Sequence, residues 1–278
     1  MNNENLEFLK NQVKYMGFGE RFNEQLEQNL QNGKPEFQLR MESEYDKDKF
    51  EAQLYFRKSD TTDMYFFNKY DAAYLKEGNM DNKLSQTFYV NGKGINNTTA
   101  KEAFNLLEGR AVQQDLTTRE GVEYKAWVQL DFDNNDDRGN FKSKQFHENY
   151  GYDLKDAVGK LPIKELGDTT QSERLMKSLE KGNIQSVTFE KDGKEERMFI
   201  SANPQFKSIN VYDSQMKPVL SEKQQQAIDA KKGESKSNGQ EQAKEKNVKQ
   251  ETPKKNSKEK PDSLLPKKRE GSGKSMKV

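Results

Sequence analysis

The most acidic stretch of the chain, Asp131–Gly139, is the first place to look for metal chemistry. An EF-hand calcium loop that starts at Asp131 needs glycine at its sixth position and glutamate at its twelfth. Those positions hold aspartate and lysine, and a loop that starts at Asp133 has arginine and lysine there. Since both registers fail, the residues predict a solvated hairpin loop rich in turn formers, without a metal site.

Acid–base and nucleophilic catalysis have few candidates. His147 is the single histidine and the chain has no cysteine, which excludes thiol nucleophiles, disulfides and zinc–thiolate sites. A serine triad would lack its Gly-x-Ser-x-Gly elbow. His147 can act as a lone general base beside Glu148 or Asp153, but a surface histidine in a loop is the simpler interpretation. The glycine pairs at 17/19 and 92/94 lack the rest of any phosphate-binding loop. The sequence therefore predicts a protein that is not an enzyme and has no cofactor.

The only tryptophan, Trp127, lies in the stretch Tyr124–Phe132. Its residues alternate strictly between two sides, as in a half-buried strand, with Ala126 and Val128 on one side and Trp127 on the other. An exposed aromatic face of this kind can stack bases or contact a protein partner. Packing between sheets is the alternative, and it is the interpretation that we favour.

Charge divides the chain into two regions. Residues 222–278 have no aromatic residue and hold 16 Lys/Arg against 9 Asp/Glu, whereas residues 1–221 hold 31 against 37. The tail is too poor in apolar residues to order itself and is predicted to be disordered. Its lysine clusters suit nucleic-acid phosphates or acidic protein surfaces, although a plain solubilising tail fits its acids equally well. The candidate contacts are Lys254, Lys255, Lys267, Lys268 and Arg269.

Strand-like stretches recur at a regular interval around Trp127. Phe50, Tyr124 and Met198 open three alternating stretches that stand 74 residues apart. A helical pattern, a glycine and a first strand precede each stretch. Capping boxes at 99–102 and 170–173 predict the start of two of these helices. A third strand-like segment follows each stretch, at residues 86–90, 142–146 and 208–212.

This recurrence predicts an α+β fold of two or three tandem modules, each a helix with an antiparallel hairpin. Ordinary helix–hairpin patterns without true repetition are the alternative. The expected segments are 1–97 (N-terminal helices and first module), 98–168 (second module), 169–220 (third, shorter module) and 221–278 (disordered basic tail). Because no long apolar segment occurs, we expect a cytoplasmic protein without membrane contact.

With these elements in place, five stretches resemble an uncharacterised domain family carried by conjugative transposons and related mobile elements of Bacteroidetes. The stretches are Phe104–Val112, Tyr124–Phe132, Gln145–Leu154, Asp192–Glu196 and Ala202–Asp213. The resemblance covers about residues 15–220 and brings no catalytic residues. It implies an accessory protein encoded with mobilisation or topoisomerase functions.

Two functions are therefore expected from the sequence. The first is a non-enzymatic adaptor of a mobile element that binds protein partners through the surfaces of its modules. The alternative is a nucleic-acid-binding accessory protein that uses the lysine-rich tail and aromatic strand faces.

Overall fold

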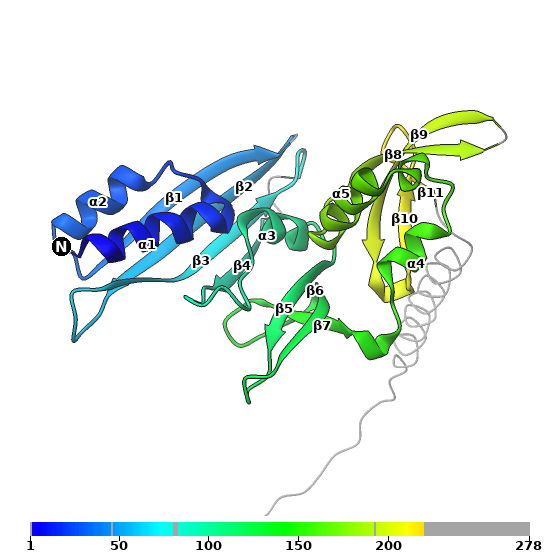
Figure 1. The fold of residues 1–278 in the computed structure, drawn as a ribbon. Helices are drawn as coiled ribbons and strands as arrows, with labels where there is room; N and C mark the ends of the chain where they lie inside the picture. Colours follow the sequence, from blue (N-terminus) through cyan, green and yellow to red (C-terminus); the bar gives the residue numbers. More distant parts are fainter. Residues whose placement is uncertain (1, 46, 80–82, 192, 220–278) are drawn as a thin grey trace, which may run out of the picture. The chain divides into compact units, whose positions relative to one another are not determined.

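The chain begins with two helices that pack on an antiparallel sheet. The computed structural model describes residues 2–45, 47–79, 83–191 and 193–219 (Figure 1). Asn2 caps α1 (Asn3–Val13) by accepting a hydrogen bond from the backbone of Asn5. A π-helical turn, η1 (Lys14–Phe18), then ends at Gly17, whose φ of 88° breaks the helix. The second helix, α2 (Asn23–Gln31), follows.

The first sheet has the order β1-β2-β3-β4. Its strands are β1 (Glu36–Tyr45), β2 (Asp48–Lys58), β3 (Tyr65–Leu75) and β4 (Leu84–Tyr89). The strand predicted at residues 86–90 is confirmed as β4, but it is the fourth strand and not the third, because β3 was not predicted. A register shift opposite Tyr55/Phe56 leaves Asn68 unpaired and interrupts the alternation of β3. Such a bulge hides a strand from a period-2 search.

The middle region contains α3 (Ala100–Leu107) and a three-stranded sheet. Thr99 and Glu102 form the predicted capping box at the start of α3. The sheet has the order β5-β6-β7. Its strands are β5 (Val112–Thr117), β6 (Glu123–Asn135) and β7 (Phe141–His147). The short helices η2 (Glu148–Tyr150), α4 (Leu154–Gly159) and η3 (Lys164–Gly167) lead onward from β7.

The last described region pairs α5 (Thr169–Glu180) with a third antiparallel sheet, of order β11-β10-β9-β8. The capping box predicted at 170–173 is wrong. Asp168 caps the helix instead, accepting from the backbone of Gln171 at 2.8 Å, since an aspartate two residues earlier starts the helix and satisfies a free amide of its first turn. The remaining elements are β8 (Gln185–Lys191), β9 (Lys194–Asn203), η4 (Pro204–Phe206), β10 (Ser208–Tyr212) and β11 (Pro218–Val219).

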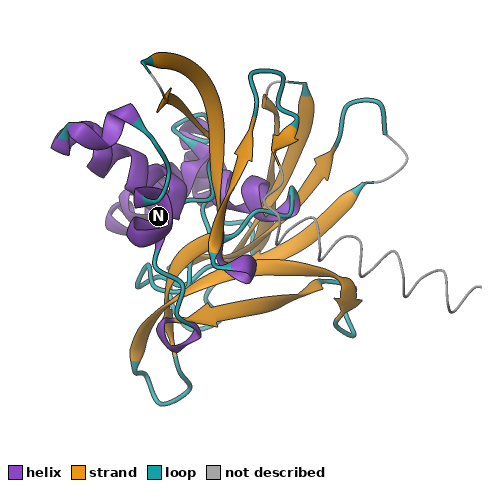
Figure 2. Cartoon of the chain, turned by 90° about the vertical axis from the view of Figure 1, so that its right-hand side faces the viewer, coloured by secondary structure: helices purple, strands orange, loops and turns teal. Residues whose placement is uncertain are grey.

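The element order confirms a mixed α+β fold, and Figure 2 shows the helices gathered beside the strands. A helix, a glycine with positive φ and an antiparallel sheet follow one another at α2, at α3 and again at α5, and the three sheets have four, three and four strands. The glycines are Gly33, Gly109 and Gly182. All described residues lie in the first of the two units into which contacts divide the chain, Met1–Gln226. Among the described residues, no helix has the length and apolar character needed to cross a membrane.

Two hydrophobic clusters meet at β6. One face of the strand sends Ala126, Val128 and Leu130 into a cluster with α1, α2, α3 and the first sheet. The opposite face sends Trp127 into a second cluster with α4, α5 and the third sheet. The predicted alternation of this strand is therefore confirmed, and it serves two cores. Neither cluster coincides with any one of the segments expected from the sequence. The boundaries of those segments stay a prediction.

Candidate functional site

The outer face of the first sheet carries a grid of polar side chains. Along β1 the apolar residues are buried and the alternate ones are exposed, because the other face packs on the helices. Direct cross-strand partners give one row of Arg40, Gln53, Asp71 and Thr87. The next row contains Gln38, Tyr55, Lys69 and Tyr89.

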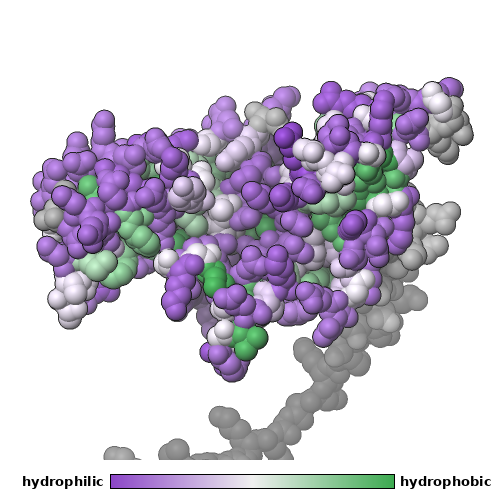
Figure 3. All heavy atoms as spheres, in the orientation of Figure 1, coloured by the Kyte–Doolittle hydropathy of each residue, from purple (hydrophilic) through white to green (hydrophobic). Residues whose placement is uncertain are grey.

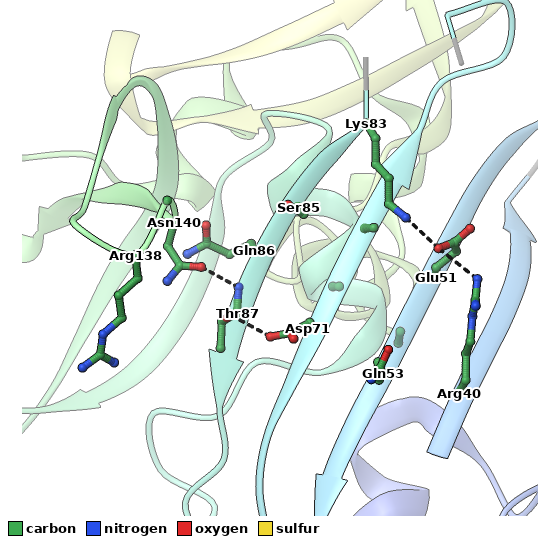
Figure 4. A pocket seen from close by; sticks show the side chains of 14 residues that line it. Arg40, Glu51, Gln53, Asp71, Lys83, Ser85, Gln86, Thr87, Arg138 and Asn140 are labelled. Atoms are coloured by element: carbon green, nitrogen blue, oxygen red, sulfur yellow. Dashed lines mark hydrogen bonds and ion pairs between the residues drawn. The ribbon is translucent and has the colours of Figure 1, made fainter. Parts of the chain in front are cut away.

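A hollow of about 410 Å³ lies on this face (Figure 4). Small side chains at its floor, Ala73 and Ser85, leave space that longer neighbours would fill. Long side chains surround it: Arg40 from β1, Lys83 before β4, and Arg138 from the hairpin between β6 and β7. The hollow thus follows from residue size at neighbouring strand positions.

Asp71 organises the floor of the hollow. One of its oxygens accepts a hydrogen bond from the Tyr55 hydroxyl at 2.6 Å. The other accepts from the Thr87 hydroxyl at 2.7 Å. The Lys69 ammonium lies 4.5 Å from the centre of the Tyr55 ring, in reach of a cation–π contact. Three strands are therefore linked through a single carboxylate.

The hydrogen bond to Asp71, together with burial, raises the pKa of Tyr55 to about 12. A raised pKa means that the folded state favours the neutral phenol, so this contribution to stability is complete below about pH 10 and is lost as pH rises towards 12. In a tyrosinate absorbance titration of the folded protein, Tyr55→Phe is expected to remove one late-ionising phenol. Asp71→Asn should instead move that phenol to lower pH. Unchanged curves for both variants would contradict the network.

Three further contacts fix the side chains at the rim. The Glu51 carboxylate accepts from the Lys83 ammonium at 2.8 Å and lies 3.4 Å from the Arg40 guanidinium. The hydrogen bond from Lys83 lowers the pKa of Glu51. Arg138 donates to the Tyr89 hydroxyl at 2.6 Å. Both acids of the hollow are therefore already paired, and N–H donors prevail at its rim.

The chemistry of the hollow is that of paired acids below a rim of N–H donors. No group of three or more histidine, cysteine or acidic residues that could hold a metal occurs in the described ranges. Hydrogen bonds or ion pairs hold the two carboxylates of the hollow, Asp71 and Glu51, in place. Its rim offers guanidinium and ammonium donors, which bind carboxylates and carbonyls through charge-assisted hydrogen bonds. The site therefore fits an acidic or amide-rich surface.

A second hollow, of about 450 Å³, lies between α1 and the segment before α3. Phe8 from α1 and Tyr15 from η1 line it and are 49% and 76% exposed. The glycine pair Gly92/Gly94 also lines it and lies in a turn between β4 and α3. Elsewhere hydrophilic residues prevail in the view of Figure 3.

The structure buries Trp127, which the sequence offered as a possible partner contact. Only 4% of this residue is exposed, and its ring meets that of Tyr152 edge-on at 5.5 Å. The indole therefore packs between sheets and does not stack on an external ligand. The other candidates, Lys254, Lys255, Lys267, Lys268 and Arg269, lie outside the described residues.

The remaining chemical candidates have structural roles. His147 ends β7 on the surface and packs against the ring of Tyr124 at 5.2 Å. Asp153 caps α4 by accepting from the backbone of Asp156. The acidic stretch forms the exposed β6–β7 hairpin, in which a hydrogen bond from Lys144 lowers the pKa of Asp131.

No family model, no curated protein and no solved structure matches the chain. The site must therefore be interpreted from its own geometry. The hollow was not predicted from the sequence, because Asp71 lies on β3 and the bulge in β3 interrupts the alternation that would have indicated a strand. The polar alternate positions of β2 and β4 were the available signal.

Proposed function

We propose that this protein is a non-enzymatic adaptor that binds a protein partner through the outer face of the first sheet. The observation that carries the proposal is the built floor of the hollow, in which Tyr55, Asp71 and Thr87 are joined by hydrogen bonds. A floor fixed in this way costs little further ordering when a partner binds. The resemblance to mobile-element proteins suggests that the partner belongs to the transfer machinery.

The charges of the face favour a protein over a nucleic acid. Arg40, Lys83 and Arg138 surround the hollow and attract acidic side chains. Asp71 and Glu51 lie between them and would repel a continuous phosphate backbone, because like charges in close contact are unfavourable. A peptide surface that alternates acidic with amide side chains complements both the positive and the negative side chains of this face.

The proposal also includes the tandem organisation of the chain. The succession of helix, glycine and antiparallel sheet at α2, α3 and α5, with four, three and four strands, supports three modules related by repetition. In this proposal the first module supplies the sheet of the binding face, and Arg138 of the second module completes its rim. The second and third modules support it through the cores that share β6.

Capture of the tagged full-length protein from its native cell tests the class of partner. The proposal expects a partner that survives nuclease treatment and deletion of residues 222–278. Loss of the partner on both treatments would overturn it. Metal- or nucleotide-dependent turnover by the purified protein would overturn its non-enzymatic part.

Nucleic-acid binding is the second candidate function, and the 16 Lys/Arg of residues 222–278 favour it. Exposed rings on the first sheet, Phe66 and Tyr89, can contribute stacking. This candidate predicts an affinity that falls steeply with salt and drops when the tail is removed. If the full-length protein fails to bind single- or double-stranded DNA or RNA at low salt, this candidate is rejected.

A further inference from the structure

Sheet edges expose unpaired backbone groups, and this fold covers several of its edges with side chains or loops. At β4, the backbone N–H of Thr87 donates to the Asn140 side chain at 2.9 Å. At β5, the carbonyl of Asp115 accepts from the backbone of Asn96, and the N–H of Thr117 donates to the Asn96 side chain. Both edges are thus closed against another strand.

The edges of the other strands are also protected. At β8, Glu190 donates to the carbonyl of Pro162, and Thr188 donates to the Glu165 carboxylate. On β7, the backbone N–H of the first residue, Phe141, donates to the Gln86 side chain. Lysines occupy the alternate positions 142 and 144 of this strand, and they discourage pairing with another strand. The terminal strand β11 has only two residues.

The outer edge of β1 differs from these edges. This strand has ten residues and ends the sheet order. Within the described part of the chain, no backbone–backbone hydrogen bond joins Glu36–Tyr45 to any segment except β2. The strand contains neither lysine nor proline, the residues that most often protect an edge. Its backbone is therefore open to an additional strand.

We propose that β1 pairs antiparallel with β1 of a second copy of this chain, centred on Met41. In this register each Arg40 lies directly opposite Glu42 of the other copy, and each Gln38 lies opposite Glu44. Arg40 and Glu42 project on one face, since they already form an ion pair of 2.9 Å along their own strand. Opposite charges across a strand pair stabilise it.

The charges select this register over its neighbours. A pairing centred on Arg40 would place the two arginines opposite each other and each Glu36 opposite Glu44. A pairing centred on Glu42 would place two glutamates in contact. Like charges directly opposite are unfavourable, so only the pairing centred on Met41 is self-complementary among these three. It joins two first sheets into one of eight strands and does not depend on the proposed function.

Sedimentation velocity of the full-length protein over a range of concentrations tests the proposal. The wild type is expected to dimerise, and Arg40→Glu or Glu42→Arg alone should weaken the dimer about tenfold or more. An equimolar mixture of the two variants should restore dimers, because each arginine then faces a glutamate. The same charge change on a neighbouring strand, Arg57→Glu, is the matched control and should leave the dimer intact.

A second measurement works even if Arg40→Glu fails to fold. In this cysteine-free chain, Gln38→Cys with Glu44→Cys should form a disulfide-linked dimer on oxidation. Gln38→Cys alone should not, since residue 38 faces residue 44. Six residues of extended strand, about 20 Å, prevent the two cysteines of one chain from meeting. A monomeric wild type at every concentration, or a dimer indifferent to the charge changes, would overturn the proposal.

Discussion

Substituting Gly182 with alanine is expected to destabilise the fold by about 3 kcal/mol or more. Gly182 follows α5 and is buried, with a φ of 76° that L side chains rarely adopt. A Cβ atom there would lie 2.7 Å from the carbonyl oxygen of Ala111 and 3.0 Å from the Val112 side chain. Backbone strain and overlap therefore add in the same variant.

The surroundings of Gly182 prevent easy relief of that overlap. Its carbonyl accepts from the Arg110 guanidinium at 2.7 Å. The neighbouring Lys181 carbonyl accepts from the Asn105 side chain at 2.6 Å. Asn105 is fully buried, so a shift of the α5 end would leave buried polar groups unpaired, which is costly.

Chemical denaturation followed by circular dichroism measures this effect. The matched control is Gly193→Ala in the β8–β9 hairpin, where φ is also positive at 70° but no atom lies within 4 Å of the added Cβ. That variant should cost only about 1 kcal/mol, the strain of the conformation alone. Equal losses for the two glycines would contradict the packing described at Gly182.

Replacing Trp127 with alanine is expected to cost about 3–5 kcal/mol, the range for large aromatic residues removed from a core. The indole is central to the second cluster, where it lies near Val158 and Leu179 in the same packed group. Removing it would leave a cavity between β6 and the elements that cover it. The expected readout is a large fall in the denaturation midpoint followed by circular dichroism.

Tyr15→Ala provides the control for this aromatic truncation. The Tyr15 side chain is 76% exposed, so its removal should change stability by no more than about 0.5 kcal/mol. A Trp127→Ala variant that keeps wild-type stability but loses its partner would contradict the structural role. It would restore the interpretation of Trp127 as a contact residue.

Local patterns predicted much of the fold. Alternation around Trp127 correctly indicated β6, and the capping box at Thr99 correctly located the start of α3. Asp-Gly is a strong hairpin signal, and the dipeptide Asp192-Gly193 stands between β8 and β9, which pair as an antiparallel hairpin. Asp192 itself lies outside the described residues. These features depend on neighbours in sequence, so one sequence suffices to find them.

Pairing between residues far apart in the sequence limited how much of the fold and of the site could be predicted. Period-2 alternation separates the two faces of β6 but does not say what covers each face, so the burial of Trp127 remained open. The hollow depends on the register that places Asp71 between Gln53 and Thr87. The bulge at Asn68 obscured β3, and with it the residue that organises the site.

The measurement that tests the binding face most directly is partner capture by a variant with a filled hollow. Ser85 is exposed on β4 at the floor, and Ser186 is exposed on β8, in the third sheet. We predict that full-length Ser85→Arg retains its fold but loses the nuclease-resistant partner, whereas Ser186→Arg captures it like the wild type. Equal capture by the two folded variants would contradict the assignment of this face as the partner-binding site.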